Sequence, residues 1–151
     1  TCFLGLEVSL KYARHAAARC AARGLTNACL AHGDGLRVFA ELVPDASLAA
    51  VHVYFPDPWW KARHKKRRVM NAGFLADVQR TLRAGGYLHF WTDVDEYFQT
   101  SLELIAATTQ LEGPLPVAER PANDDLDYHT HFERRTRLGG LPVYRAEFRK
   151  R

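Results

Sequence analysis

The stretch LAAVHVYF at residues 48–55 is almost entirely apolar and rich in β-branched and aromatic residues, and it runs directly into PDPWW at residues 56–60. Such a run is typical of a strand inside a parallel sheet, so we expect a mid-sheet strand here. The two prolines stiffen the backbone on either side of Asp57. Its carboxylate is therefore expected at a defined place beyond the carboxyl end of the strand.

Apolar strands alternate with helices along the rest of the chain. Ser9, Asn71 and Asp95 are candidate helix caps, and Gly24 and Gly85-Gly86 stand where helices are expected to stop. The order predicts one domain over residues 1–151 with an α/β fold, whose mostly parallel sheet has an antiparallel C-terminal end. We expect strands at 3–8, 27–31, 48–55, 87–91, 114–119 and 142–148, helices at 10–23, 36–42, 71–85 and 95–105, and a loop at 120–128.

Four acidic residues follow four of these strands, namely Glu7, Asp34, Asp57 and Asp93. Ligands of open α/β sheets bind outside the carboxyl ends of the strands, and randomly placed acids would be scattered over the surface. The sequence therefore predicts a site at this edge. Glu7 stands where nucleotide-binding folds place an acid for ribose hydroxyls, although the dipole of the following helix favours an acid there equally.

The 151 residues are 47% apolar and 25% charged, which fits one compact, soluble domain. The three cysteines, Cys2, Cys20 and Cys29, are odd in number and lack Cys-x-x-Cys spacing. This usage favours a reducing, cytoplasmic compartment over a secreted scaffold or a zinc site. No apolar run is long enough for a membrane span, and the first residues lack the pattern of a signal peptide.

The positive charge of the chain is concentrated in one segment. Lysine and arginine total 21 against 17 acids, and residues 61–68 (KARHKKRR) hold six of those cations and no acid. Trp59 and Trp60 directly precede this segment. Cations beside aromatic rings suit RNA, because the cations bind phosphates and a ring can stack on an exposed base. A solvated loop is the simpler alternative for a basic run alone.

The runs FPDPWWKARHKKRR (55–68), RAGGYLHFWTD (83–93) and THFE (130–133) resemble segments of the bacterial TrmB-type tRNA (guanine-N7)-methyltransferases. This resemblance implies a class I S-adenosylmethionine-dependent methyltransferase (Rossmann-like) fold, with S-adenosylmethionine as cofactor and no metal. It also implies tRNA as the partner, methylated at N7 of the guanine at position 46 in the variable loop.

The resemblance also assigns roles residue by residue. Glu7 and Asp34 correspond to cofactor-binding acids, and Asp57 to the central catalytic residue near both the methyl donor and the target base. His131 fills the variable place of its motif. The implied substrate contacts are Lys61, Asp93, Thr130, His131, Phe132 and Glu133, and the implied RNA contacts are Arg63, His64, Lys65, Lys66, Arg67 and Arg68.

One departure from the family pattern concerns the N-terminus. In these enzymes a first strand and a glycine-rich loop, which wraps the methionine part of the cofactor, precede the strand that matches FLGLEV at 3–8. Because this chain starts at Thr1, we expect an N-terminally incomplete domain that lacks the central strand of its sheet.

Methylation at guanine N7 requires no general base, because N7 carries a lone pair and no proton. The reaction requires alignment and stabilisation of the positive charge that moves onto the purine. Asp57, Asp93 and Glu133 are candidates to accept hydrogen bonds from guanine N1–H and the exocyclic amine, which would also select against adenine. We expect the base to leave its stack and to be held by Trp59 or Trp60.

Three alternatives remain open on the sequence. The DPW run could belong to methyltransferases that act on an exocyclic amino group of adenine or cytosine. The chain could also be a non-catalytic RNA-binding module of the same fold, although acids at one edge repel phosphate. Finally, His129-x-His131 with Asp127 nearby could bind a metal, but the segment lacks cysteine partners.

Overall fold

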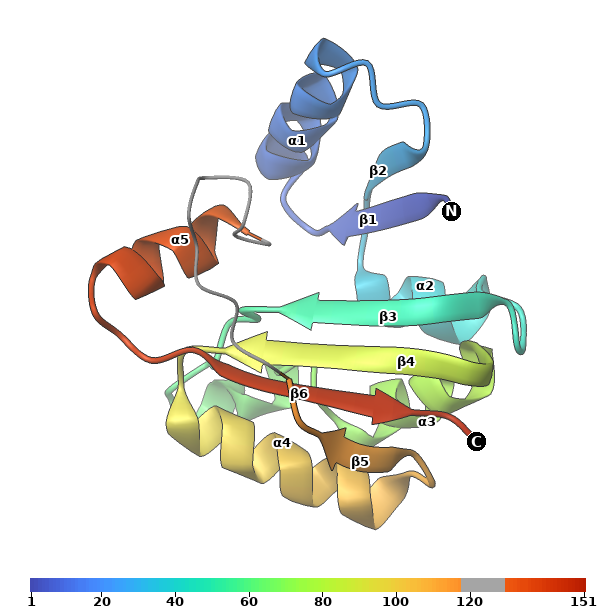
Figure 1. The fold of residues 1–151 in the computed structure, drawn as a ribbon, viewed down its shortest axis with the longest axis vertical. Helices are drawn as coiled ribbons and strands as arrows, with labels where there is room; N and C mark the ends of the chain where they lie inside the picture. The colour runs from blue at the N-terminus through green and yellow to red at the C-terminus, as the bar shows by residue number, and fades with distance from the viewer. Residues whose placement is uncertain (118–129) are drawn as a thin grey trace. The chain divides into compact units, whose positions relative to one another are not determined.

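The computed structural model describes residues 1–117 and 130–151, apart from the side chains of Ala62, Lys65 and His131. The predicted loop at 120–128, with Asp124, Asp125 and Asp127, lies outside the described residues, and so does His129. The chain folds as two compact units, Thr1–Val43 and Pro44–Arg151 (Figure 1).

The first unit is a parallel βαβα arrangement. Strand β1 (Phe3–Glu7) pairs in parallel with β2 (Ala28–His32), helix α1 (Leu10–Ala22) connects them, and α2 (Gly35–Glu41) follows. Gly24 ends α1 as predicted, because its φ of 63° allows its N–H to donate to Ala21 and that of Leu25 to Cys20.

Two expectations for this unit are wrong. The Ser9 side chain does not cap α1; instead, the Ser9 N–H donates to Oε1 of Glu7 at 2.7 Å. The first strand is also less buried than expected, with Phe3 53% and Leu4 59% exposed. The reason is that this two-stranded sheet has little core beneath it, since Ala13 of α1 is the one buried residue among the described residues of the unit.

The second unit is built on a four-stranded sheet in the order β3-β4-β6-β5. Strands β3 and β4 are parallel, and β6 runs antiparallel to both β4 and β5. This confirms the predicted parallel sheet with an antiparallel C-terminal end. The elements are β3 (Leu48–Tyr54), the 3₁₀ helix η1 (Ala62–Arg67), α3 (Ala72–Thr81), β4 (Leu82–Thr92), α4 (Asp95–Thr108), β5 (Glu112–Leu115), α5 (His131–Leu138) and β6 (Tyr144–Arg149).

Helices α3 and α4 contact each other and β4, and they cover one face of this sheet. Strand β3 lies at the end of the strand order and not in the middle as expected. Its side chains alternate, with Val51 and Val53 buried and His52 exposed. The alternation follows from burial on one face only. The fully buried core consists of Leu75, Val78, Leu82, Leu88, Phe90, Tyr97, Ile105 and Phe148.

The ends of α3 differ from the prediction at one terminus. Asn71 caps the helix as expected, with its Oδ1 accepting from Phe74 N–H at 3.0 Å. The helix ends at Thr81, however, and the glycine pair lies inside β4, where Gly85 N–H donates to the carbonyl of Lys150. The Lys150 ammonium caps the helix by donating to the carbonyls of Gln79 at 2.6 Å and Leu82 at 2.7 Å.

Helix α4 begins at Asp95, and Val94 is its N-cap residue, so the expected cap at Asp95 is wrong by one position. Thr92 Oγ1 accepts from Val94 N–H at 3.2 Å, which satisfies the entry to the helix. Its buried face consists of Tyr97, Ser101 and Ile105.

Helix α5 was not anticipated, although its sequence carries a signal. Thr130 caps it through Oγ1, which accepts from Glu133 N–H at 2.9 Å, and Thr-x-x-Glu is the signature of a capping box. Glu133 is 1% exposed. Its Oε1 accepts from Arg145 of β6 at 3.1 Å and from Arg137 of α5 at 3.3 Å. This buried ion pair docks α5 on the sheet.

Replacing Glu133 with Gln, a neutral side chain of similar size, should lower the free energy of unfolding by about 3 kcal/mol. The reason is that Arg137 and Arg145 would then lack their buried negative partner. Urea denaturation measures this change. Glu147→Gln, which affects the more exposed pair with His89, is the control and should cost less than about 1 kcal/mol. Equal losses for the two variants would show that the Glu133 pair does not stabilise the fold.

Lys150→Met keeps the aliphatic stem but removes both hydrogen bonds to the end of α3. We expect it to lower the free energy of unfolding by about 1–2 kcal/mol. The control is Arg151→Met, since the Arg151 side chain is 81% exposed and its loss should cost less than about 0.5 kcal/mol. Thermal melting that is unchanged by Lys150→Met would contradict the capping role.

Candidate functional site

The turn after β3 holds Asp57 in a strained backbone. Phe55 and Trp59 both adopt positive φ, 49° and 46°, which non-glycine residues rarely do. The Phe55 N–H donates to the Trp91 carbonyl at 2.8 Å, and Asp57 Oδ1 accepts from the Trp59 N–H at 2.9 Å. Disfavoured conformations of this kind cluster at functional sites. The exposed Asp57 carboxylate is therefore held in place, as the sequence predicts.

Asp93 lies at the same edge of the sheet as Asp57. In the parallel register Tyr54 pairs with Trp91, so the residues that follow β3 and β4 emerge side by side. Asp93 is half-buried and directly precedes the N-cap residue of α4. The structure thus brings together two of the acids that the sequence places at strand ends.

The THFE segment joins this edge from the other side. Strand β6 starts there, because Tyr144 pairs with Thr92 and Arg145 with Trp91. Glu133 reaches the edge through its pair with Arg145, and the Phe132 ring lies 4.8 Å from that of Phe55. Thr130 contributes the helix cap described above, and the side chain of His131 lies outside the described residues.

Glu7 and Asp34 share the corresponding edge of the first unit. Glu7 pairs in register with His32, the last residue of β2, and Asp34 follows two residues later. Each uses one carboxylate oxygen locally. Glu7 Oε1 accepts from Ser9 N–H, and Asp34 Oδ1 accepts from Leu36 N–H at 2.9 Å as the N-cap of α2. Within the part of the chain that the structure describes, the second oxygen of each has no hydrogen-bond partner.

The basic segment divides into outward and inward cations. Lys61, Arg63, Lys66 and Arg67 are exposed, His64 is half-buried, and Lys65 lies outside the described side chains. Arg68 is only 8% exposed, and its Nε donates to the Pro58 carbonyl at 2.7 Å. The implied role of Arg68 as a direct RNA contact therefore does not fit its position, because its guanidinium faces the protein.

The two tryptophans also differ in their surroundings. The Trp59 ring is covered by the Arg67 guanidinium at 5.1 Å and meets the His64 ring edge-on at 5.7 Å. Trp60 is 64% exposed. Trp60 is therefore the accessible ring of the pair, a distinction that adjacent identical residues in a sequence cannot show.

A cluster on the sheet face was not foreseen. His52 of β3 stacks on His89 of β4 with ring centroids 4.4 Å apart, and His89 Nδ1 lies 3.0 Å from Glu147. Burial raises the pKa of Tyr54 to about 12. The Tyr54 hydroxyl lies 2.8 Å from His52 Nδ1, within hydrogen-bond distance. The sequence carried one signal for this cluster. His52 and Tyr54 stand two residues apart in a strand, so their side chains are expected on the same face of the sheet.

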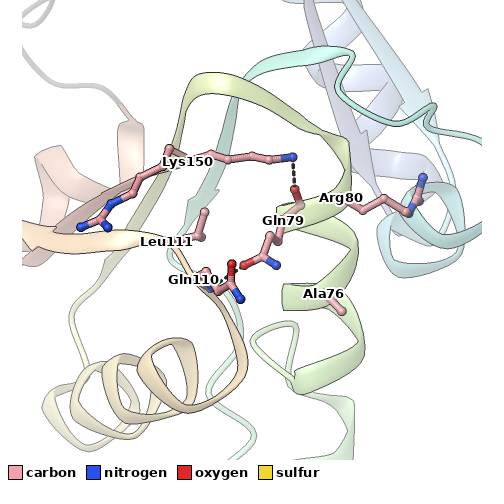
Figure 2. Close-up of a pocket in the computed structure, with 7 residues that line it drawn as sticks. Ala76, Gln79, Arg80, Gln110, Leu111 and Lys150 are labelled. Atoms are coloured by element: carbon pink, nitrogen blue, oxygen red, sulfur yellow. Dashed lines mark hydrogen bonds between the residues drawn. The ribbon is translucent and has the colours of Figure 1, made fainter.

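A surface pocket of about 290 Å³ lies far from these acids. It is lined by α3, Gln110, Leu111 and the chain end, with Gln79 and Lys150 in its wall (Figure 2). Lys150 is already engaged with the last carbonyls of α3, at the opposite edge of the sheet from Asp93. This pocket therefore does not coincide with the acid-lined edge.

The described residues contain neither a metal-binding cluster nor a membrane-spanning helix. Within residues 1–117 and 130–151 no three His, Cys, Asp or Glu side chains are grouped so that they could hold a metal ion. The proposed set with Asp127 and His129 lies outside these ranges. In the same ranges no helix combines the length and apolarity that crossing a membrane requires.

Known proteins resemble the chain in sequence and in fold. A protein of Rhodopirellula baltica named tRNA (guanine-N(7)-)-methyltransferase is 52% identical over 99% of this chain and 57% of its own length. One of Ralstonia nicotianae with the same name is 39% identical over 99% of this chain and 59% of its own. The chain thus spans less than two thirds of the length of these curated relatives.

The fold is that of known methyltransferases. The crystal structure of a methyltransferase homolog protein from Pyrococcus horikoshii covers 99% of this chain, and the chain covers 53% of that protein, with a TM-score of 0.67 at 15% identity. This confirms the class I methyltransferase fold predicted from the sequence.

The family model described as "Putative methyltransferase" matches residues 1–146. Its match covers the strained Asp57 turn, the basic segment and the acids at both sheet edges. Together with the names of the curated relatives, it confirms the resemblance identified in the sequence. The chain belongs to this methyltransferase family.

Proposed function

We propose that the protein is a tRNA (guanine-N7)-methyltransferase, which transfers a methyl group from S-adenosylmethionine to N7 of the guanine at position 46. The observation that carries this proposal is the combination of the Asp57 turn with the relatives of that name, 52% and 39% identical over 99% of the chain. The exposed carboxylate of Asp57, beside that of Asp93, suits a site that must stabilise a cationic purine.

The acids of the first unit suit the nucleoside part of the cofactor. Glu7 keeps one carboxylate oxygen for ribose hydroxyls, and Asp34 keeps one for the adenine side of the site, since each uses only its other oxygen locally. When bound, S-adenosylmethionine supplies the methyl group from its sulfonium. The chain's own residues hold it and align the acceptor base.

The acids of the second unit suit guanine. Asp57 and Asp93 would accept hydrogen bonds from N1–H and the exocyclic amine, and the edge of adenine would leave these acceptors unpaired. As positive charge develops on the purine, a fixed carboxylate stabilises it more than the neutral base. Glu133 contributes less directly, because its Oε1 is held by Arg145 and Arg137, and it supports the position of Phe132.

The outward cations of the basic segment suit the tRNA backbone. Lys61, Arg63, Lys66 and Arg67 stand within eleven residues of Asp57 and face solvent. Phosphates bound here would place the tRNA next to the acid-lined edge. Trp60 is the exposed ring, so we assign to it the stacking on the turned-out base.

The deciding experiment uses unmodified tRNA, isotopically labelled S-adenosylmethionine and mass spectrometry of the nucleosides. Label in 7-methylguanosine supports the proposal. Label at an exocyclic amino group would favour the alternative enzyme class, and tRNA binding without any label would favour an RNA-binding module.

Replacing Asp57 with Asn should lower kcat/KM for methyl transfer by about a hundredfold to a thousandfold, since the charge is lost where the cation forms. The turn should persist, because the Asn side-chain oxygen still accepts from Trp59 N–H. Steady-state methylation kinetics measure the change. Glu103→Gln, an exposed acid on the surface of α4, is the matched control, and an equal effect of both variants would contradict the role of Asp57.

Replacing Arg63 and Lys66 together with Gln should flatten the salt dependence of tRNA binding by about 0.7–0.9 in log–log slope for each lost phosphate contact. Binding titrations over a range of salt concentrations measure this slope. Arg83 and Arg149 are exposed cations at the opposite edge of the same sheet, and their double replacement is the control. The same slope for both double variants would remove the basic segment from the RNA interface.

A further inference from the structure

We propose that Arg68 is a positioning residue that holds the Asp57 turn against α4, although it stands at the end of the basic segment. The inference rests on the proposed function for its catalytic consequence. Its structural basis is independent of that function. Arg68 is 8% exposed, whereas Arg63, Lys66 and Arg67 of the same segment are exposed. One run of identical charges therefore contains a side chain with a different task.

The first contact of Arg68 is with the turn itself. Its Nε donates to the carbonyl of Pro58 at 2.7 Å, across ten residues of chain. Pro58 directly follows Asp57, and the next residue, Trp59, donates its N–H to the Asp57 carboxylate. The charged guanidinium of Arg68 therefore ties the end of the segment 58–68 to its beginning, next to Asp57.

The second contact of Arg68 is with α4. Its guanidinium carbon lies 4.6 Å from the centre of the Tyr97 ring, and its Nη2 lies 3.9 Å from Oε1 of Glu96. Tyr97 is 1% exposed, and its hydroxyl accepts from Met70 N–H at 3.2 Å. A planar cation on a buried ring is a geometry that arginine supports and lysine does not.

These contacts connect the two acids of the proposed base site. Helix α4 starts two residues after Asp93, so the stack of Arg68 on Tyr97 ties the Asp57 turn to the element that follows Asp93. Burial raises the pKa of Tyr97, the charge of Arg68 opposes this rise, and the charge of Asp57 adds to it. Arg68 and Asp57 therefore both lie within electrostatic reach of the Tyr97 hydroxyl.

The turn needs such support because its backbone is disfavoured. Phe55 and Trp59 both hold positive φ on either side of Asp57. Residues in sparsely populated conformations persist only when the surrounding structure holds them there. Without Arg68, the turn keeps the Phe55 N–H bond to Trp91 and its internal bond to Asp57, together with the ring contacts of Phe55 and Trp59. Displacement of Asp57 by even a small distance would lower the rate of a reaction that depends on alignment.

The test compares Arg68→Gln, Arg68→Lys and Lys66→Gln with the wild-type protein in steady-state methylation and in amide hydrogen exchange. Arg68→Gln should lower kcat about tenfold or more, with the KM for tRNA within about twofold because the side chain does not reach the phosphates. Lys66→Gln should show the reverse split, with a raised KM for tRNA. Arg68→Lys should recover part of kcat, since its ammonium donates to Pro58 but does not lie flat on Tyr97.

Hydrogen exchange supplies a readout that needs no activity. In Arg68→Gln the Trp59 amide should exchange about tenfold faster or more, while the amides of Leu88 and Phe90 in the core stay protected. If Arg68→Gln does not fold, Arg68→Lys carries the same comparison.

Two results would overturn the positioning role. They are an unchanged exchange rate at Trp59, and a raised KM for tRNA with unchanged kcat in Arg68→Gln. A wild-type protein that forms no 7-methylguanosine would overturn the proposed function instead, and the exchange rate at Trp59 would still decide the structural role of Arg68.

Discussion

Strands β3 and β4 run parallel from Ala50 to Tyr54 and from Tyr87 to Trp91, and this pairing brings the turns that contain Asp57 and Asp93 to one edge of the sheet. Their inward side chains, among them Val53 and Phe90, are buried, and the Phe90 ring contacts Tyr97 and Phe98 of α4. The register leaves no freedom to slide, because a shift by one residue would turn the buried valines of β3 to solvent. The burial of the apolar side chains of β3 and β4 therefore fixes the register, and with it the positions of both acids.

The charged residues at this edge differ in position and in role. Acids lie at the strand ends, and the cations of the same unit have separate tasks. Arg68 and Arg145 are turned inward, where one holds the Asp57 turn and the other holds Glu133 and thereby α5. Arg63, Lys66 and Arg67 face solvent, where a polyanion can reach them. In the proposed function, the acids of this edge stabilise positive charge on one base and the outward cations bind phosphates of the RNA.

The local elements were largely predictable from the sequence. The cap at Asn71, the stop at Gly24 and the alternation of strands and helices are confirmed, because each depends on neighbouring residues and on the backbone conformations that they favour. The capping box at Thr130 and Glu133 was overlooked, although it was present in the sequence. The expected end of α3 at the glycine pair was wrong, because the strand pairing of Gly85 with Lys150 and the cap by the Lys150 ammonium come from the far end of the chain.

The sequence by itself determined the class of fold, the family and the acids and cations from which the site is made. These properties depend on residue types and spacing within short segments. Only the tertiary structure decided which of these residues face inward. Arg67 and Arg68 are adjacent and chemically identical, and so are Trp59 and Trp60, yet one of each pair packs against the protein and the other faces solvent. The reason is that a side chain's environment is set by the elements it meets, here Pro58 and Tyr97 for Arg68, and these are ten and twenty-nine residues away along the chain.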